Sequence, residues 1–62
     1  MKIIVDAFGG DNAPLEILKG CAMAVSEYGF KIILVGKEKE IKRIAAENDI
    51  YLYNMEIVDA PD

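Results

Sequence analysis

The sequence has no histidine and only one cysteine, Cys21, and these absences exclude several kinds of site. Zinc sites are built mainly from histidine and cysteine ligands, so a chain with one thiol and no imidazole offers no set for that metal. A single cysteine also cannot close an internal disulfide, which fits a reducing, cytoplasmic compartment. We therefore expect neither a metal nor a disulfide to hold this fold together.

Long apolar runs and an excess of positive charge are missing as well. No apolar run approaches the ~20 residues that cross a bilayer, and three apolar residues followed by Asp6 do not resemble a signal peptide. The chain carries 7 Lys+Arg against 11 Asp+Glu, a formal net charge of −4. Because nucleic acids bind basic surfaces, we expect no nucleic-acid partner. The hydrophobic fraction of 53% likewise argues against intrinsic disorder.

Short apolar segments alternate with amphipathic ones along the chain. The apolar segments are rich in β-branched residues without a polar alternation, which is typical of parallel strands covered on both faces. The amphipathic segments have helical spacing. The first of these helices should begin at Ala13 or Pro14, because proline suits a first turn, and end at Gly29. The predicted order is strand 2–6, helix 15–28, strand 31–36, helix 37–48 and strand 55–59.

This β-α-β-α-β order predicts an α/β fold: half of a doubly wound, Rossmann-like parallel sheet. Two helices cannot cover both faces of such a sheet, so an edge and part of one face should stay bare. A chain of ~60 residues buries only about 60% of its unfolded surface. We therefore expect residues 1–62 to be a single partial domain, the N-terminal segment of a larger α/β enzyme. The alternative is a complete small domain that dimerises through its open edge.

The loop between the first strand and the first helix is the most informative segment. In open α/β sheets, ligands bind beyond the carboxyl ends of the strands, and this loop follows Asp6 at such an end. Gly9 and Gly10 let the backbone turn sharply and approach a ligand, and a helix N-terminus favours an anion such as phosphate. The alternative is an ordinary tight turn whose glycines serve geometry alone.

Nucleotide cofactors do not fit the same loop. Gly9 and Gly10 have no third glycine at the spacing that dinucleotide binding requires. No Gly-Lys-Ser/Thr follows, which excludes a P-loop. We therefore expect neither NAD nor ATP, and no cofactor.

Three carboxylates should lie near the same sheet edge: Asp6, Asp11 and Asp59. They could bind Mg²⁺, orient a substrate or hold loop N–H groups. Of the three, Asp6 is the strongest candidate because an acid that ends a buried strand needs a partner. For Asn12 we favour helix capping, and for Asp59 a solvated acid that ends its strand.

No nucleophile with an evident base appears in the sequence. Cys21 falls on the apolar stripe of the first helix, and no histidine is present to activate it, so we interpret it as a core residue. Tyr28, Tyr51 and Tyr53 are interpreted as packing residues. The catalytic residues are therefore unknown at this point, and much of the chemistry of a parent enzyme should lie elsewhere.

The residues Ile3-Ile4-Val5-Asp6-Ala7-Phe8-Gly9-Gly10-Asp11-Asn12-Ala13-Pro14 resemble the opening of the bacterial phosphate acyltransferases of phospholipid synthesis, the PlsX type. Those proteins begin with a strand and Asp-Ala-Met-Gly-Gly-Asp, followed by a variable residue and a proline two positions further on. Phe8 replaces the methionine, a change between bulky apolar residues. Ile33–Gly36 and Glu56–Asp62 resemble the second and third strands of the family, so the resemblance covers nearly the whole chain.

The resemblance implies transfer of a fatty acyl group from acyl carrier protein to inorganic phosphate, which gives acyl phosphate. It further implies a cytoplasmic, membrane-associated homodimer several times longer than this chain, with no nicotinamide. The family motif maps onto Asp6, Gly9, Gly10, Asp11 and Asn12 as the loop for phosphate or acyl phosphate. Two other functions stay open: a receiver-like phosphoacceptor module, and a non-catalytic binding module that docks on the rest of its own parent.

Overall fold

The computed structural model describes residues 1–7 and 14–60, and its elements follow the predicted order. The elements are β1 (Lys2–Asp6), α1 (Leu15–Tyr28), β2 (Lys31–Gly36), α2 (Glu38–Glu47) and β3 (Met55–Asp59). Helix α1 begins at Leu15, one residue after Pro14, which occupies the N-cap position. The predicted bounds of the three strands are confirmed, and α2 is one residue shorter than predicted at each end.

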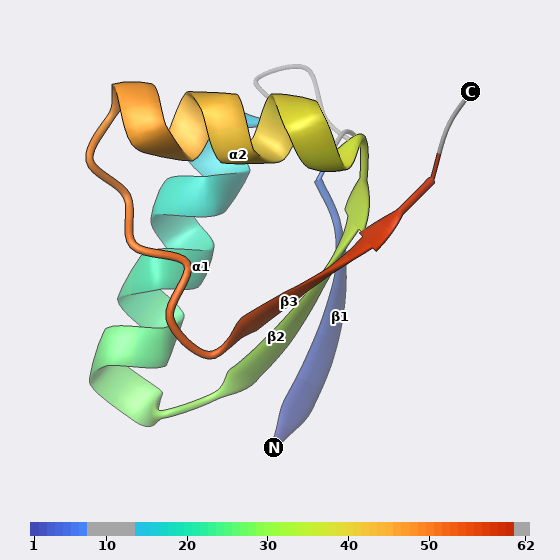
Figure 1. The fold of residues 1–62 in the computed structure, drawn as a ribbon. Helices are drawn as coiled ribbons and strands as arrows, with labels where there is room; N and C mark the ends of the chain where they lie inside the picture. Colours follow the sequence, from blue (N-terminus) through green and yellow to red (C-terminus); the bar gives the residue numbers. More distant parts are fainter. Residues whose placement is uncertain (8–13, 61–62) are drawn as a thin grey trace.

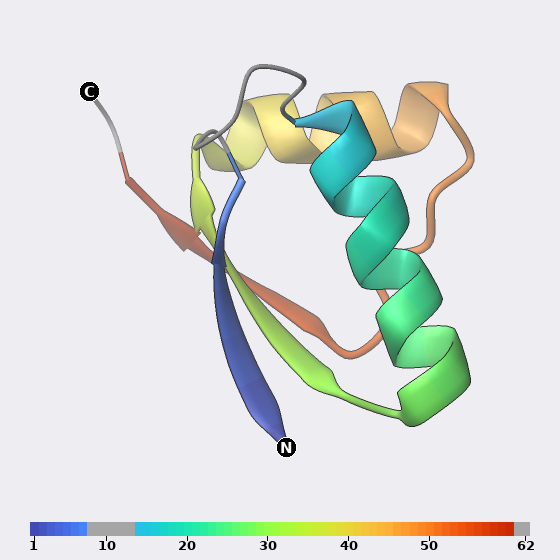
Figure 2. The ribbon, with the colours of Figure 1, turned by 180° about the vertical axis from the view of Figure 1, so that it is seen from behind.

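The three strands form one parallel sheet in the order β1-β2-β3, with β2 in the middle. Both crossovers step in the same direction across the sheet, and right-handed crossovers then place both helices on one face. Figures 1 and 2 show α1 and α2 on the same side of the sheet. This arrangement confirms the predicted half of a Rossmann-like doubly wound fold.

The hydrophobic core lies between the sheet and the two helices. Alternate residues of β2, Ile32 and Leu34, point to the helices and are 2% and 0% exposed. Leu18 of α1 and Ile41 of α2 close the core from the other side, and both are fully buried. Cys21 is also buried, as its position on the apolar stripe predicts, and desolvation raises the pKa of its thiol.

The opposite face of the sheet is open among the residues that the structure describes. Ile4 is 71% exposed and Val58 is 48% exposed, although both belong to apolar strands. The apolar strand pattern predicts cover on both faces, and for this part of the chain that expectation is wrong. The expectation that part of one face stays bare is confirmed, because both helices lie on the other side.

Ion pairs lie along the surface of α2, and a polar side chain ends the helix. Glu38 and Lys42 form an ion pair at 2.9 Å, and Arg43 bridges Glu40 and Glu47 at 2.6 and 3.0 Å. Asn48, the C-cap residue of α2, is exposed. Its side-chain amide donates a hydrogen bond of 2.8 Å to the Ile44 carbonyl and ends the helix.

The tyrosines, predicted to be packing residues, are mostly exposed to solvent. Tyr28, Tyr51 and Tyr53 are 67%, 84% and 75% exposed. Tyr28 stacks on Phe30, with ring centroids 5.3 Å apart, so it does contribute one aromatic contact. The hydrophobic pattern of the sequence could not distinguish an exposed aromatic ring at the edge of the core from a buried one, because both kinds of position adjoin apolar residues.

Gly29 ends α1 in the left-handed conformation, with φ +69°, and its N–H bonds the Val25 carbonyl at 2.9 Å. We expect Gly29→Ala to destabilise the chain by about 1 kcal/mol, because a Cβ is strained at this φ. An added Cβ meets nothing within 4 Å at either Gly29 or Gly20, so packing does not enter the comparison. Gly20 lies inside α1, and Gly20→Ala should stabilise by about 0.5–1 kcal/mol. Urea denaturation measures the unfolding free energy of both variants. Equal changes of the same sign in the two variants would contradict the predicted strain at Gly29.

Candidate functional site

The candidate site is the edge of the sheet where all three strands end and both helices begin. β1, β2 and β3 run in the same direction, so Asp6, Gly36 and Asp59 come to one edge. Figure 1 shows the first turns of α1 and α2 near this edge. The amide dipoles of both helices therefore point toward it with their positive ends, which favours anions.

Asp6 lies at this edge, as predicted. It is exposed and pairs in register with Val35 of β2. The next residue, Ala7, is fully buried, and its N–H donates a hydrogen bond of 2.9 Å to the Val35 carbonyl. This bond extends the β1–β2 pairing by one residue and fixes the point where the chain leaves the sheet. The loop that begins there thus starts from a rigid anchor at the carboxyl edge.

The other residues of the predicted phosphate loop, Gly9, Gly10, Asp11 and Asn12, lie outside the described residues. Their predicted role stays a prediction. The two residues that flank the loop in the structure, Ala7 and Pro14, are both placed, one at the end of β1 and one at the N-cap of α1. Pro14 makes no side-chain capping bond, so it does not compete with an anion for the amides of the first turn.

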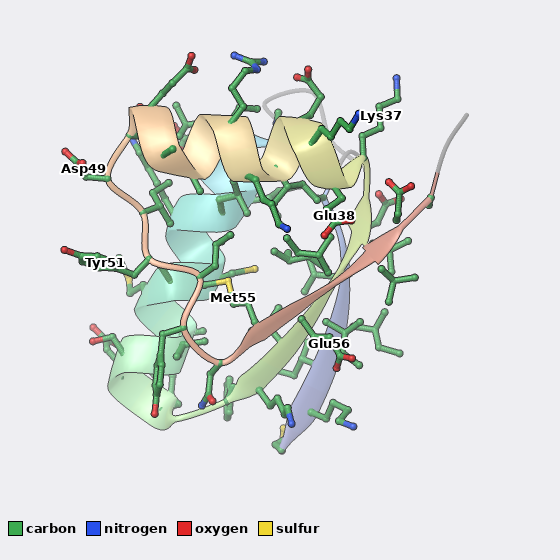
Figure 3. The ribbon with its side chains drawn as sticks, in the orientation of Figure 1. Lys37, Glu38, Asp49, Tyr51, Met55 and Glu56 are labelled. Carbon is green, nitrogen blue, oxygen red and sulfur yellow. The ribbon has the colours of Figure 1, made fainter. Side chains whose placement is uncertain are left out.

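Asp59 has a role that the sequence analysis missed. Its Oδ1 accepts a hydrogen bond of 3.0 Å from the backbone N–H of Glu38, the first residue of α2. The residue is exposed, but it is a cap for a helix distant in sequence rather than the free solvated acid that we favoured. Lys37, the N-cap residue of α2, makes no side-chain cap. Figure 3 shows Glu38 at the start of α2, close to the carboxyl end of β3.

The two helix N-termini at this edge therefore differ. The first amide of α2 already bonds a carboxylate of the protein itself, which acts there as the anion. The start of α1 lies next to the glycine-containing loop, and its own N-cap residue supplies no such group. An anion at the start of α2 would therefore compete with Asp59 for this amide.

We expect Asp59→Ala to destabilise the chain by about 1 kcal/mol, the usual cost of losing a helix cap. Asp59→Asn, which keeps an oxygen acceptor at the same position, should lose less stability than Asp59→Ala. Glu56→Ala is the matched control, because Glu56 lies in the same strand but points away from the helices (Figure 3). Thermal unfolding followed by circular dichroism measures all three, and equal loss in Glu56→Ala and Asp59→Ala would contradict the assignment.

The described part of the chain holds no cluster of three or more acidic or thiol ligands that could bind a metal ion. Asp6 and Asp59 come to the same edge, but one oxygen of Asp59 is engaged by α2. No helix in residues 1–7 and 14–60 is long and apolar enough to cross a membrane.

A second concave feature, a groove of about 550 Å³, lies between α1 and residues 49–55. Its floor is mostly apolar, and Lys19, Ser26 and Asp49 line it with Tyr51 and Tyr53. Figure 3 shows Asp49 and Tyr51 on the segment that runs beside α1. Local sequence patterns could not predict this groove, because its two sides, residues 19–26 and 49–55, lie at least 23 positions apart in the chain. It contains no nucleophile paired with a base.

Taken together, these features define a class: a parallel α/β unit with a glycine-containing segment after its first strand, at the carboxyl edge of the sheet. Within that class, a family model described as "Fatty acid synthesis protein" matches residues 1–62. The chain belongs to this fatty acid synthesis protein family. This match confirms the family resemblance that we inferred from residues 3–14 and from the second and third strands.

The similar proteins with curated names are phosphate acyltransferases. The chain is 48% identical to the phosphate acyltransferase of Dictyoglomus turgidum over 65 aligned residues, which cover all of this chain and 18% of that protein. It is also 48% identical to the phosphate acyltransferase of Aquifex aeolicus over 65 residues, with 100% and 19% covered. The Desulforudis audaxviator phosphate acyltransferase is 53% identical over 45 residues, with 73% and 13% covered. The chain thus spans less than a fifth of the length of these relatives.

Proposed function

We propose that this chain is the N-terminal part of an acyltransferase that moves a fatty acyl group from acyl carrier protein to inorganic phosphate. A phosphate oxygen attacks the thioester carbonyl, the carbon–sulfur bond breaks, and the carrier leaves with its free thiol. The product is an acyl phosphate. The observation that carries the proposal is the identity of 48% to a phosphate acyltransferase along the whole chain.

The site supports an assignment of phosphate rather than of carrier protein to this part of the enzyme. The loop of Gly9, Gly10, Asp11 and Asn12 joins β1 to α1 at the carboxyl edge, where an anion is stabilised by helix amides. We propose that Gly9 and Gly10 let backbone amides approach phosphate. Asp6 and Asp11 hold the loop or a bound water.

The oligomeric state, the compartment and the lack of a cofactor are part of the same proposal. The parent enzyme is a homodimer in the cytoplasm with peripheral membrane association, and it uses no cofactor. We expect the chain by itself to be inactive, because it spans less than a fifth of the length of its relatives. The receiver-like alternative is weakened by Asp59, since its carboxylate engages the amide of Glu38 rather than standing ready for phosphorylation.

A chimera tests the proposal. Residues 1–62 replace the matching segment of the Dictyoglomus turgidum enzyme, and release of the carrier thiol from acyl-carrier protein is followed at several phosphate concentrations. We expect a rate that rises with phosphate and saturates, within about tenfold of the parent enzyme, because a tenfold loss corresponds to only 1.36 kcal/mol of activation energy. A folded chimera without phosphate-dependent release would contradict the proposal. The parent enzyme assayed alongside is the control.

A further inference from the structure

The groove beside α1 has two different ends. It lies between α1 and the segment that joins α2 to β3, and both run toward the amino end of the sheet (Figure 1). Its charged lining residues, Lys19 and Asp49, are the first that each segment contributes, so they lie at the same end. Val25, Tyr53 and Met55 line the opposite end and carry no charge. The groove therefore has a polar end toward the start of α1 and an apolar end away from it.

The polar end of the groove lies about one helical turn from the carboxyl edge of the sheet. Lys19 is four residues beyond Leu15, the first residue of α1, and four helical residues rise about 6 Å. Lys19, Ala22 and Ser26 follow one another at spacings of three and four residues, so they share one face of α1. From Lys19 to Ser26 this face is about 10 Å long. A ligand whose polar end lies near the start of α1 thus enters the groove within one turn.

The lining of the groove suits an alkyl chain. Its floor consists of apolar residues that are buried or half-buried: Ala22, Val25, Ile50 and Met55. Tyr51 and Tyr53 line it while 84% and 75% exposed, and such rings cover apolar groups and keep their hydroxyls in water. Figure 3 shows Tyr51 on the segment that leads to Met55. The volume of about 550 Å³ is typical of sites for small molecules.

A polypeptide fits the groove less well than an alkyl chain does. The N–H groups of Ile50 and Met55 already donate hydrogen bonds of 2.8 and 3.1 Å to the carbonyls of Ala45 and Leu52. On the opposite wall, α1 uses its backbone groups within the helix. An extended peptide would bury N–H and C=O groups without partners here, and that burial is costly. An alkyl chain has no such groups to satisfy.

We propose that the groove beside α1 holds the fatty acyl chain of the substrate, with its carbonyl end toward Lys19 and its tail toward Met55. This inference rests on the proposed function and adds the place where the chain lies. The polar end of the groove matches the carbonyl end of this ligand, and the apolar end matches its tail. Each buried methylene group strengthens binding roughly fourfold, so the groove favours long acyl chains over short ones.

Filling the groove with a side chain tests the proposal through chain-length specificity. Ala22→Phe places a ring on the floor of the groove. Met23→Phe is the matched control, because Met23 is the next residue of α1, is 61% exposed and does not line the groove. Release of the carrier thiol is measured in the chimera described above, with butyryl-carrier protein and with hexadecanoyl-carrier protein.

We expect Ala22→Phe to lower kcat/KM for the hexadecanoyl substrate about tenfold or more, because displacing two methylene groups is enough for such a loss. The butyryl substrate should change by less than about twofold, since its chain is too short to fill the groove. Met23→Phe should leave both values within about twofold of the unmodified chimera. Equal losses for the two substrates in Ala22→Phe, or no loss for either, would overturn the proposal.

A binding measurement makes the test independent of catalysis. Met55 lines the groove and Met23 does not, so their methyl groups report on ligands inside and outside it. The chimera is prepared with ¹³C-labelled methionine methyl groups, and Met55→Leu and Met23→Leu identify the two NMR signals. We expect dodecylphosphonate to shift the Met55 signal and not the Met23 signal, and inorganic phosphate to shift neither. Ala22→Phe should abolish the shift. A Met55 signal that dodecylphosphonate leaves in place would overturn the proposal.

The two proposals can fail separately. A chimera that forms acyl phosphate, but whose Met55 signal does not respond to dodecylphosphonate, overturns the acyl groove and leaves the acyltransferase function in place. A chimera that forms no acyl phosphate, but whose Met55 signal shifts with dodecylphosphonate, overturns the function and leaves a site for alkyl chains in place. A Met55 shift that depends on protein concentration without any ligand would identify a second copy as the occupant and would overturn the groove proposal.

Discussion

Gly10→Val in the chimera is expected to abolish acyl-phosphate formation, with a loss of at least about a hundredfold in rate, or about 2.7 kcal/mol of activation energy. A branched side chain at this position would keep the backbone amides of the loop away from the phosphate, and glycine is the residue that allows such close approach. Phosphate-dependent release of the carrier thiol measures the loss. The thermal midpoint should stay close to that of the unmodified chimera, because the loop precedes α1 rather than lying inside it.

Gly20→Ala is the control for this prediction, because Gly20 lies inside α1 with open space around it. It should leave the rate unchanged. Near-normal activity in Gly10→Val would mean that the loop is not the phosphate site, even if the chain belongs to an acyltransferase.

Leu34→Ala should destabilise the isolated chain by about 2–5 kcal/mol. Leu34 is fully buried on the middle strand, on the face of the sheet that both helices cover. Truncating its side chain therefore leaves a cavity in the core. A domain of this size has roughly 0.05–0.15 kcal/mol of stability per residue, so the variant should be largely unfolded at 37 °C. Circular dichroism during urea denaturation gives the change in unfolding free energy.

Ile4→Ala is the matched control, because Ile4 lies in the adjacent strand and is 71% exposed. Its effect should stay within about 0.5 kcal/mol in the isolated chain. Similar losses in Leu34→Ala and Ile4→Ala would mean that the core does not lie where the structure places it, or that the face of the sheet around Ile4 is covered.

Most of the fold could be predicted from local patterns. The β-branched run at residues 31–36 and the cap at Gly29 predicted a strand and a helix end that the structure confirms. Patterns of this kind report which residues avoid water in the complete protein. They could not show that Ile4 and Val58 would be exposed in this chain, because that depends on which other elements are present.

The site could be predicted less completely. Asp6 and the direction of the strands follow from the order of the elements, so the carboxyl edge was predictable. The bond between Asp59 and the amide of Glu38 was not, because the two residues lie 21 positions apart and meet only through the parallel register of β2 and β3. The groove beside α1 escaped prediction for the same reason. Long-range contacts of this kind leave no local pattern.

The most direct test of the central claim is to identify the product that the chimera makes from acyl-carrier protein and inorganic phosphate. Mass spectrometry of the quenched reaction should show an acyl phosphate that takes up the label when the phosphate carries ¹⁸O, with one free carrier thiol per product. Free fatty acid formed at a rate independent of phosphate would contradict the account, because water rather than phosphate would then be the acceptor.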